Sequence, residues 1–192
     1  MNLNKRLENI KSKITKKDFL HGKGLANEIS FYIFDYDPED EMAVREYISY
    51  LKKDIHAENS DINIVEIDLY KIIINSLKER NYLERVFQLE ERKKSIFIID
   101  TIKKSLRLTL SDDIVIKKIC EEIDEKTSMI FLVGVGKAWP IIRSHSILNN
   151  LHSKIDKIPL IMFFPGIYEG ELKLFSEITD DNYYRAFKLI ER

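Results

Sequence analysis

Apolar residues along the chain form two kinds of pattern, short runs with few interruptions and longer stretches with helical spacing. The short runs are rich in aromatic and β-branched residues, which is typical of buried strands. They lie at 29–36, 62–70, 129–135 and 159–166. Because both faces of a central parallel sheet are covered, its strands carry few polar residues. These runs therefore predict the central strands of a sheet.

The stretches between the strands have helical spacing. Asp37 can cap a helix that begins at Pro38 and continues over about 39–56. An N-terminal helix over about 2–20 is predicted by four apolar residues with spacings of four, three and four, namely Leu3, Leu7, Ile10 and Ile14. Further helices are expected over 71–95, 96–108, 111–127 and 140–152. A short strand leading to a helix is the alternative for 96–108, and a capping serine, Ser111, is expected to open the next helix.

The alternation of strands and helices predicts βαβ units and hence the α/β class. We expect a mostly parallel twisted sheet with helices on both faces, in a P-loop-NTPase-like or Rossmann-like layout without a Walker motif. Turn residues at Gly170 and at 180–182 predict an edge hairpin near the C-terminus. A length of 192 residues suits one domain over 1–192, with the N-terminal helix at its start.

Composition narrows the functional classes. The chain is 44% hydrophobic and 33% charged with a net charge of -1, which is typical of a soluble globular protein and lacks the basic excess of most autonomous DNA-binding domains. It has no apolar leader and no long apolar run, and Cys120 is its single cysteine. We therefore expect a cytoplasmic protein in which Cys120 is a packed core thiol.

The N-terminal helix is basic. Two interpretations remain open, a solvated helix face, which is favoured, and an arm that contacts phosphates. The residues concerned are Lys5, Arg6, Lys11, Lys13, Lys16 and Lys17.

The segment "MIFLVGVGKAWP", residues 129–140, resembles a nucleotide-binding loop at first sight. A Walker loop needs a glycine where Phe131 stands and a serine or threonine where Ala138 stands. A dinucleotide fingerprint needs a third glycine where Trp139 stands. The favoured interpretation is a turn from strand to helix, with Pro140 as the first helical residue.

Two other groups of side chains could bind a metal ion. An acidic cluster follows the first strand and could hold magnesium, although a solvated turn and helix start is favoured; it comprises Asp35, Asp37, Glu39, Asp40 and Glu41. His145 and His152 are seven residues apart, which does not suit a helical zinc pair, so hydrogen-bonded structural roles are favoured. No nucleophile is set in a catalytic motif. The sequence therefore predicts no enzyme, no metal and no cofactor.

Three segments carry a resemblance to a known family. They are "GVGKAWPIIRSHSILNNL" at 134–151, "PLIMFFPGIYEGELKLF" at 159–175 and "DDNYYRAFKL" at 180–189. In this order and spacing they resemble the BrxB family, the small component of BREX phage-defence systems. The resemblance implies a non-enzymatic adaptor that binds other BREX proteins, first the PglZ-like protein of the alkaline-phosphatase superfamily, then the BrxC-like ATPase and the DNA methyltransferase. The resemblance implies that the protein contacts DNA only indirectly and does not bind a membrane.

The matching blocks supply the candidate partner-binding residues. Large aromatic and arginine side chains dominate the energy of many interfaces, which favours Trp139, Arg143, Tyr184 and Arg185. The full set of candidates is Trp139, Arg143, His145, Asn149, Asn150, Tyr168, Tyr183, Tyr184 and Arg185. Core packing remains the alternative for 183–187. Two further functions stay open, a degenerate nucleotide-binding domain that regulates the complex and an accessory DNA-binding component.

Overall fold

A computed structural model describes residues 2–20, 30–92, 95–155, 158–179 and 186–192. Its centre is a sheet in the order β2-β3-β4-β1-β7, in which all neighbours are parallel. The strands are β1 (Phe31–Tyr36), β2 (Asn63–Asp68), β3 (Thr127–Val133), β4 (Leu160–Tyr168) and β7 (Phe187–Lys188). The predicted parallel α/β sheet is thus confirmed.

An antiparallel extension continues from the end of β4. The chain turns at Gly170, which has a φ of 88°, and returns as β5 (Leu172–Leu174), which pairs with β4. The short strand β6 (Ile178–Thr179) then pairs with β5. The hairpin expected near the C-terminus is therefore present, while its second predicted turn, 180–182, lies outside the described residues.

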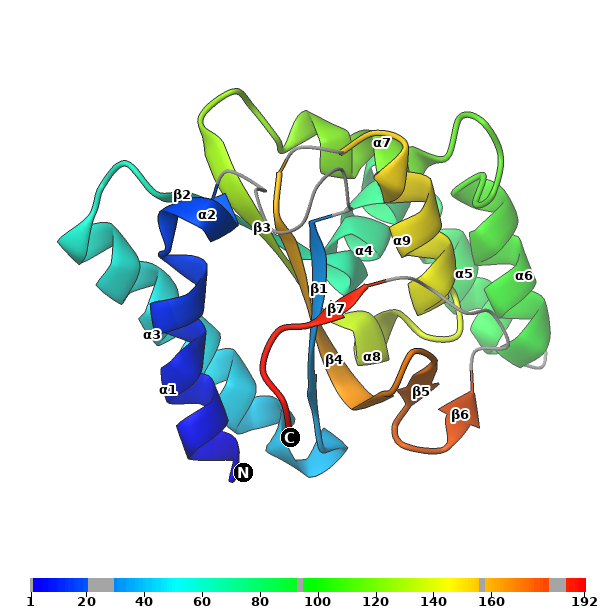
Figure 1. The fold of residues 1–192 in the computed structure, drawn as a ribbon. Helices are drawn as coiled ribbons and strands as arrows, with labels where there is room; N and C mark the ends of the chain where they lie inside the picture. The colour runs from blue at the N-terminus through cyan, green and yellow to red at the C-terminus, as the bar shows by residue number, and fades with distance from the viewer. Residues whose placement is uncertain (1, 21–29, 93–94, 156–157, 180–185) are drawn as a thin grey trace.

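Helices cover both faces of the sheet (Figure 1). One face carries α1 (Leu3–Ile14), α2 (Lys17–Leu20) and α3 (Glu41–Glu58), which follows the short 3-10 helix η1 (Pro38–Asp40). The other carries α4 (Leu69–Glu79), α5 (Leu83–Glu90), α6 (Ser95–Ser105), α7 (Ile114–Glu121), α8 (Val135–Ala138) and α9 (Ser144–His152). The layer order that the sequence predicts is confirmed.

Alternation along each strand divides the core in two. On β3, Ile130 and Leu132 pack under α4 to α9, whereas Phe131 and Val133 pack under α1 and α3. Successive side chains of a strand point to opposite faces, so a strand buried on both sides must be apolar throughout. This explains why the strands appear in the sequence as continuous apolar runs.

Several helix boundaries differ from the predictions. The helix expected over 2–20 is divided into α1 and α2, and the one expected over 71–95 is divided into α4 and α5. Asn81 adopts a left-handed φ of 56° and the Tyr82 amide donates to Leu77 O at 2.8 Å, which ends α4 in a C-terminal capping turn. Asp113, not Ser111, caps α7, because its Oδ1 accepts from the amides of the first turn.

The largest boundary error concerns Pro140. It was expected to open a helix over 140–152, but it follows a cis peptide bond after Trp139 and lies in a turn. The helix α9 begins at Ser144, after an extended Arg143. A separate short helix, α8, occupies the position where the sequence suggested a simple turn.

Candidate functional site

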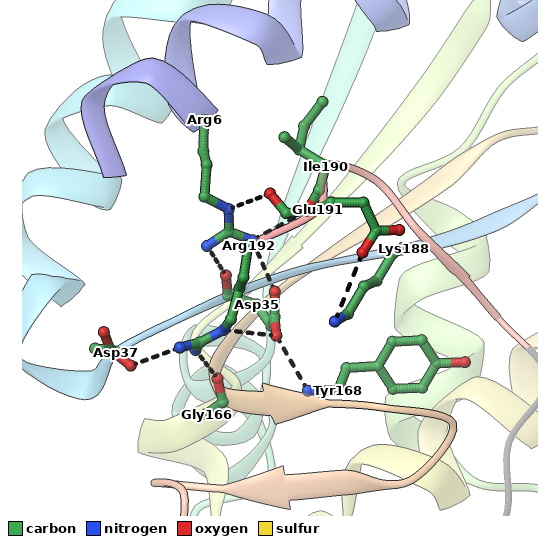
Figure 2. Close-up of polar contacts among 9 residues, drawn as sticks. All are labelled: Arg6, Asp35, Asp37, Gly166, Tyr168, Lys188, Ile190, Glu191 and Arg192. Atoms are coloured by element: carbon green, nitrogen blue, oxygen red, sulfur yellow. Dashed lines mark hydrogen bonds and ion pairs between the residues drawn. The ribbon is translucent and has the colours of Figure 1, made fainter. Parts of the chain in front are cut away.

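The carboxyl end of β1 contains a buried carboxylate, Asp35 (Figure 2). Its Oδ1 accepts a hydrogen bond from Arg6 Nη2 at 2.7 Å. Its Oδ2 accepts from Arg192 Nε at 3.0 Å and from the Tyr168 amide at 3.2 Å. Both oxygens are thus occupied by the protein's own donors, which argues against the magnesium alternative for this residue. Among the described residues, no group of three or more acidic, histidine or cysteine side chains could hold a metal.

Arg6 ties together three parts of the chain. Besides the Asp35 carboxylate, it donates to Asp35 O at 2.7 Å and, at 3.1 Å, to the carbonyls of Ile190 and Glu191. Its guanidinium also lies over the Phe34 ring, 4.7 Å from the centroid. The favoured interpretation of this residue as part of a solvated face was therefore wrong, because Arg6 is a buried anchor.

Other basic residues of α1 also have partners within the chain. Lys11 Nζ lies 2.6 Å from both Asp54 and Glu58, and its hydrogen bond with Asp54 is the main cause that raises its pKa. Lys13 donates to Leu189 O at 2.6 Å, and burial lowers its pKa. These contacts attach α1 to α3 and to the C-terminal segment, so much of the basic character of α1 serves the fold.

Arg192 closes the same network from the other side (Figure 2). Its Nη1 lies 2.9 Å from Asp37 Oδ1, and its Nη2 donates to Gly166 O at 2.7 Å. The Asp37 side chain makes no capping bond, which corrects the role predicted for it. Arg192 was not identified from the sequence, since nothing near it in the chain indicates its partners.

The carboxyl ends of β2 and β3 contain a second internal ion pair. Lys137 Nζ lies 2.9 Å from Asp68 Oδ2, while Asp68 Oδ1 accepts from the amides of Tyr70 and Lys71 and so caps α4. Gly134 has a φ of 73°, and a Cβ there would overlap the Asp68 carboxylate. The segment "GVGK" is therefore the junction from β3 into the short helix α8, and its lysine forms an ion pair with Asp68.

A pocket of 280 Å³ opens beside this pair, between α3 and the ends of β2 and β3. Ligands of doubly wound sheets bind at this edge. Its lining mixes acids and bases, namely Glu41, Met42, Arg45, Glu46, Ile48, Ser49, Glu66, Asp68, Lys71, Val133, Gly134 and Lys137. Since Asp68 holds Lys137, this edge presents no phosphate cradle of the Walker kind.

A different surface collects four of the predicted partner-binding residues. Trp139 is 39% exposed, Arg143 and Asn149 are exposed, and Asn150 is half-buried. They lie before and along α9, and we call the area around them the α9 surface. Their side chains make no hydrogen bond or ion pair with the rest of the described chain.

Three neighbouring pockets lie along the α9 surface. The first, of 150 Å³, lies between Trp139 and Arg143; the second, of 310 Å³, runs from Arg143 to Asn150; the third, of 690 Å³, continues from Asn150 past Asn149 to Lys154. Neighbouring pockets share Arg143 or Asn150, so the predicted residues border all three pockets. Pockets of this kind, lined by apolar, amide, basic and acidic side chains, suit a protein segment.

Two other predicted residues are buried. His145 is 8% exposed, and its Nε2 lies 3.0 Å from Ser146 Oγ. The Tyr168 hydroxyl donates to Ala186 O at 2.7 Å and accepts from the Ala186 amide at 3.1 Å. In this arrangement Tyr168 attaches the C-terminal segment to β4. The remaining candidates, Tyr183, Tyr184 and Arg185, lie outside the described residues.

The α9 surface also contains residues that the sequence did not indicate. Lys103, Leu110 and Lys154 line its pockets, and so does Cys120, which is half-buried. Cys120 packs against the core as predicted, and burial raises its pKa. Leu110 is the one residue with a local signal, because an apolar side chain between Thr109 and Ser111 in a polar turn is expected to be exposed.

No helix in the described ranges has the length and apolar character needed to cross a membrane.

The fold and these sites define a class. The chain is a doubly wound α/β protein in which Asp35 and Asp68 at the strand ends form internal ion pairs, while Trp139 and Arg143 are exposed before α9. The family model "BREX protein BrxB" matches residues 65–189. The chain belongs to the BrxB family.

Two relatives extend the match over nearly the whole chain. A BREX protein BrxB of Bacillus cereus (strain H3081.97) is 50% identical over 191 residues, which are 99% of this chain and 98% of that protein. A BREX protein BrxB of Escherichia coli O9:H4 (strain HS) is 37% identical over 191 residues, 96% of this chain and 90% of that protein. No solved structure matches. The resemblance seen in three sequence segments is thus confirmed, and the chain is a BREX component.

Proposed function

We propose that this BREX component is a non-enzymatic adaptor that binds other BREX proteins through the α9 surface. The first expected partner is the PglZ-like protein, followed by the BrxC-like ATPase and the DNA methyltransferase. Membership in the BrxB family supports a role inside this assembly. The adaptor would act as the single domain predicted over 1–192, with DNA met only indirectly.

One observation carries the proposal. The charged residues at the strand ends, where α/β proteins usually bind ligands, are engaged in Asp35–Arg192 and Asp68–Lys137 pairs. Trp139 and Arg143, by contrast, are exposed beside pockets and have no partner in the described chain. Aromatic and arginine side chains in this setting are typical anchors of protein interfaces.

The alternative of a nucleotide-binding regulator has weaker support, because Lys137 is held by Asp68 and its loop lacks the phosphate-binding pattern. A thermal-shift titration with ATP and magnesium would test it. A micromolar site should raise stability by about 2–3 kcal/mol at a nucleotide concentration of ~100 times the dissociation constant.

Co-expression with the PglZ-like protein of the same locus tests the adaptor, with the ATPase and the methyltransferase as parallel baits. We expect stoichiometric recovery of one partner by the natural protein and strongly reduced recovery by the Trp139→Ala and Arg143→Ala variants. Matched controls are Tyr50→Ala and Arg45→Ala, which remove an exposed aromatic and an exposed arginine from α3. Figure 1 shows α3 on the opposite face of the sheet from α9. Recovery of no BREX protein by the folded natural chain would contradict the proposal.

A further inference from the structure

On the α9 surface the acidic side chains have partners within the chain, whereas several basic side chains do not. Its acids have partners close by: Asp112 lies 2.6 Å from Arg107, Asp113 caps α7, and Glu121 lies 3.7 Å from Lys117. Its bases differ, and three of them have no ion pair with any residue in the described ranges, namely Lys103, Arg143 and Lys154. The pocket linings contain both signs of charge, but the charged side chains left without a polar partner within the described ranges are cationic.

Apolar side chains form the floor between these bases. Leu110 is 54% exposed and lines the largest of the three pockets together with Ile116 and Cys120. Ile141 and Ile147 continue this floor in the neighbouring pocket toward Arg143. A ligand that covers the surface would thus bury apolar groups and also meet cations, a combination found at protein interfaces.

The amides of α9 add a third feature. Asn149 and Asn150 border the largest pocket together with Ser153, and the two amide side chains are not used within the described chain. An amide offers one acceptor and two donor hydrogens, which match the carbonyl and N–H groups of a peptide backbone. Such groups would hold a bound segment in register without adding charge.

We propose that the α9 surface binds an acidic amphipathic segment of the partner BREX protein. Apolar residues of that segment pack on Leu110, Ile116 and Ile141, and its carboxylates face Arg143 and Lys154. This inference rests on the proposed adaptor function and adds the chemistry of the bound segment. The bases of the α9 surface without an ion pair favour this occupant, because carboxylates of a bound segment would supply the partners that Lys103, Arg143 and Lys154 lack in the described chain.

Two other occupants fit less well. A second copy of the chain would bring the same uncompensated bases against each other, which is unfavourable in a self-complementary contact. Nucleic acid would contact the cations, but the phosphate backbone gains nothing from the apolar floor of Leu110 and Ile141. Both occupants are outcomes of the experiment below.

A charge-reversal pair tests the proposal in the complex with the partner recovered by co-expression. The Arg143→Glu/Lys154→Glu variant changes two exposed bases on the α9 surface, and Arg45→Glu/Lys53→Glu makes the same net change on α3. Affinity is measured by biolayer interferometry at several salt concentrations, after nuclease treatment. We expect about a tenfold or greater loss for the first variant, a loss within about twofold for the second, and weaker binding of the natural protein at high salt.

A photo-crosslinking amino acid in place of Leu110 identifies the bound segment. We expect one partner peptide with several Asp or Glu residues, and reversal of those acids to lysine should restore binding to the Arg143→Glu/Lys154→Glu variant. Crosslinking to a basic or uncharged peptide, to a second copy of this chain, or to no partner peptide would overturn the inference. So would loss of partner recovery on nuclease treatment, or unchanged affinity of the charge-reversed variant. Recovery of no BREX protein by the natural chain would instead overturn the proposed function on which the inference rests.

Discussion

Arginine side chains have opposite roles in two regions of this protein, the carboxyl end of β1 and the α9 surface. At the carboxyl end of β1, Arg6 and Arg192 surround the buried Asp35 and leave neither of its oxygens free (Figure 2). Along α9, Arg143 lies beside two pockets with no partner in the described chain. The first arginines hold the fold together, whereas the second is available to another molecule.

The comparison shows that fold class alone does not locate the site. In doubly wound sheets the crevice at the carboxyl ends of the strands is the usual binding place. Here that edge contains the ion pairs Asp35–Arg192 and Asp68–Lys137. Arg143, Asn149 and Asn150, which have no side-chain partner in the described chain, lie instead before and along α9, so function has to be argued from individual side chains.

The largest effect is expected at the centre of the buried network. Asp35→Asn should lower the free energy of unfolding by about 3–5 kcal/mol, because it leaves the buried Arg6 without its counter-charge. Urea denaturation followed by circular dichroism measures this. The control is Asp37→Asn, which removes an exposed partner of Arg192 and should change stability by less than about 1 kcal/mol. Similar losses for both variants would show that Asp35 is not the anchor.

A smaller loss is expected at the other strand end. Gly134→Ala should lower the free energy of unfolding by about 1–3 kcal/mol, because its φ of 73° disfavours a side chain and the new Cβ would meet Asp68. In an Asp68→Ala background the same change should cost less, since the carboxylate is gone. A double-mutant cycle measures the difference. Additive losses would mean that backbone strain alone accounts for the glycine.

Tyr168 and Asn149 should separate stability from binding. Tyr168→Phe removes both hydrogen bonds to Ala186 and should lower the free energy of unfolding by about 1–2 kcal/mol, while partner recovery is preserved. Asn149→Ala should change stability by less than about 0.5 kcal/mol but weaken partner recovery. Thermal melting and the co-expression assay together measure both properties. Weakened recovery with the folded Tyr168→Phe variant would assign the Tyr168 hydroxyl to the interface.

The smallest effect is confined to alkaline pH. Burial raises the pKa of Tyr47 on α3 to about 12, against about 10 for an unperturbed tyrosine. Between these values the unfolded chain loses the phenol proton while the folded chain retains it, so stability falls as pH rises from about 10 to 12. Tyr47→Phe should reduce this fall without altering the slope below pH 9. Melting temperatures measured from pH 8 to 11.5 would show it, and an unchanged alkaline slope would contradict it.

Local patterns were sufficient for most of the fold. The runs at β1, β3 and β4 are apolar at nearly every position, and that property predicts both the strands and the helical layers on either face. The predicted start of the helix at α9 was less accurate, because a residue typical of a helix start lies in a turn. Pro140 suits the first turn of a helix, yet Ile142 bonds back to Ala138 O and the turn is completed before Ser144 starts α9.

The candidate site was only partly visible in the sequence. Trp139, Arg143, Asn149 and Asn150 lie within 12 consecutive residues, so closeness in the sequence already indicated that they share one region. Lys103 and Leu110 join them only because α6 and the loop after it pack beside α9 and the residues that precede it. Their contribution depends on packing between distant segments, which local periodicity does not encode.

The sequence by itself determined the α/β class, the order of the layers and the family, because these depend on local spacing and on contiguous motifs. Tertiary structure alone decided which charges are paired. Asp35 is 29 residues from Arg6 and 157 from Arg192, and strand order brings the three together. Similarly, Lys137 reaches Asp68 across 69 residues, while Arg143 is left without a partner in the described chain. A charged side chain in a sequence is ambiguous, and only its neighbours in space make it a structural anchor or a binding group.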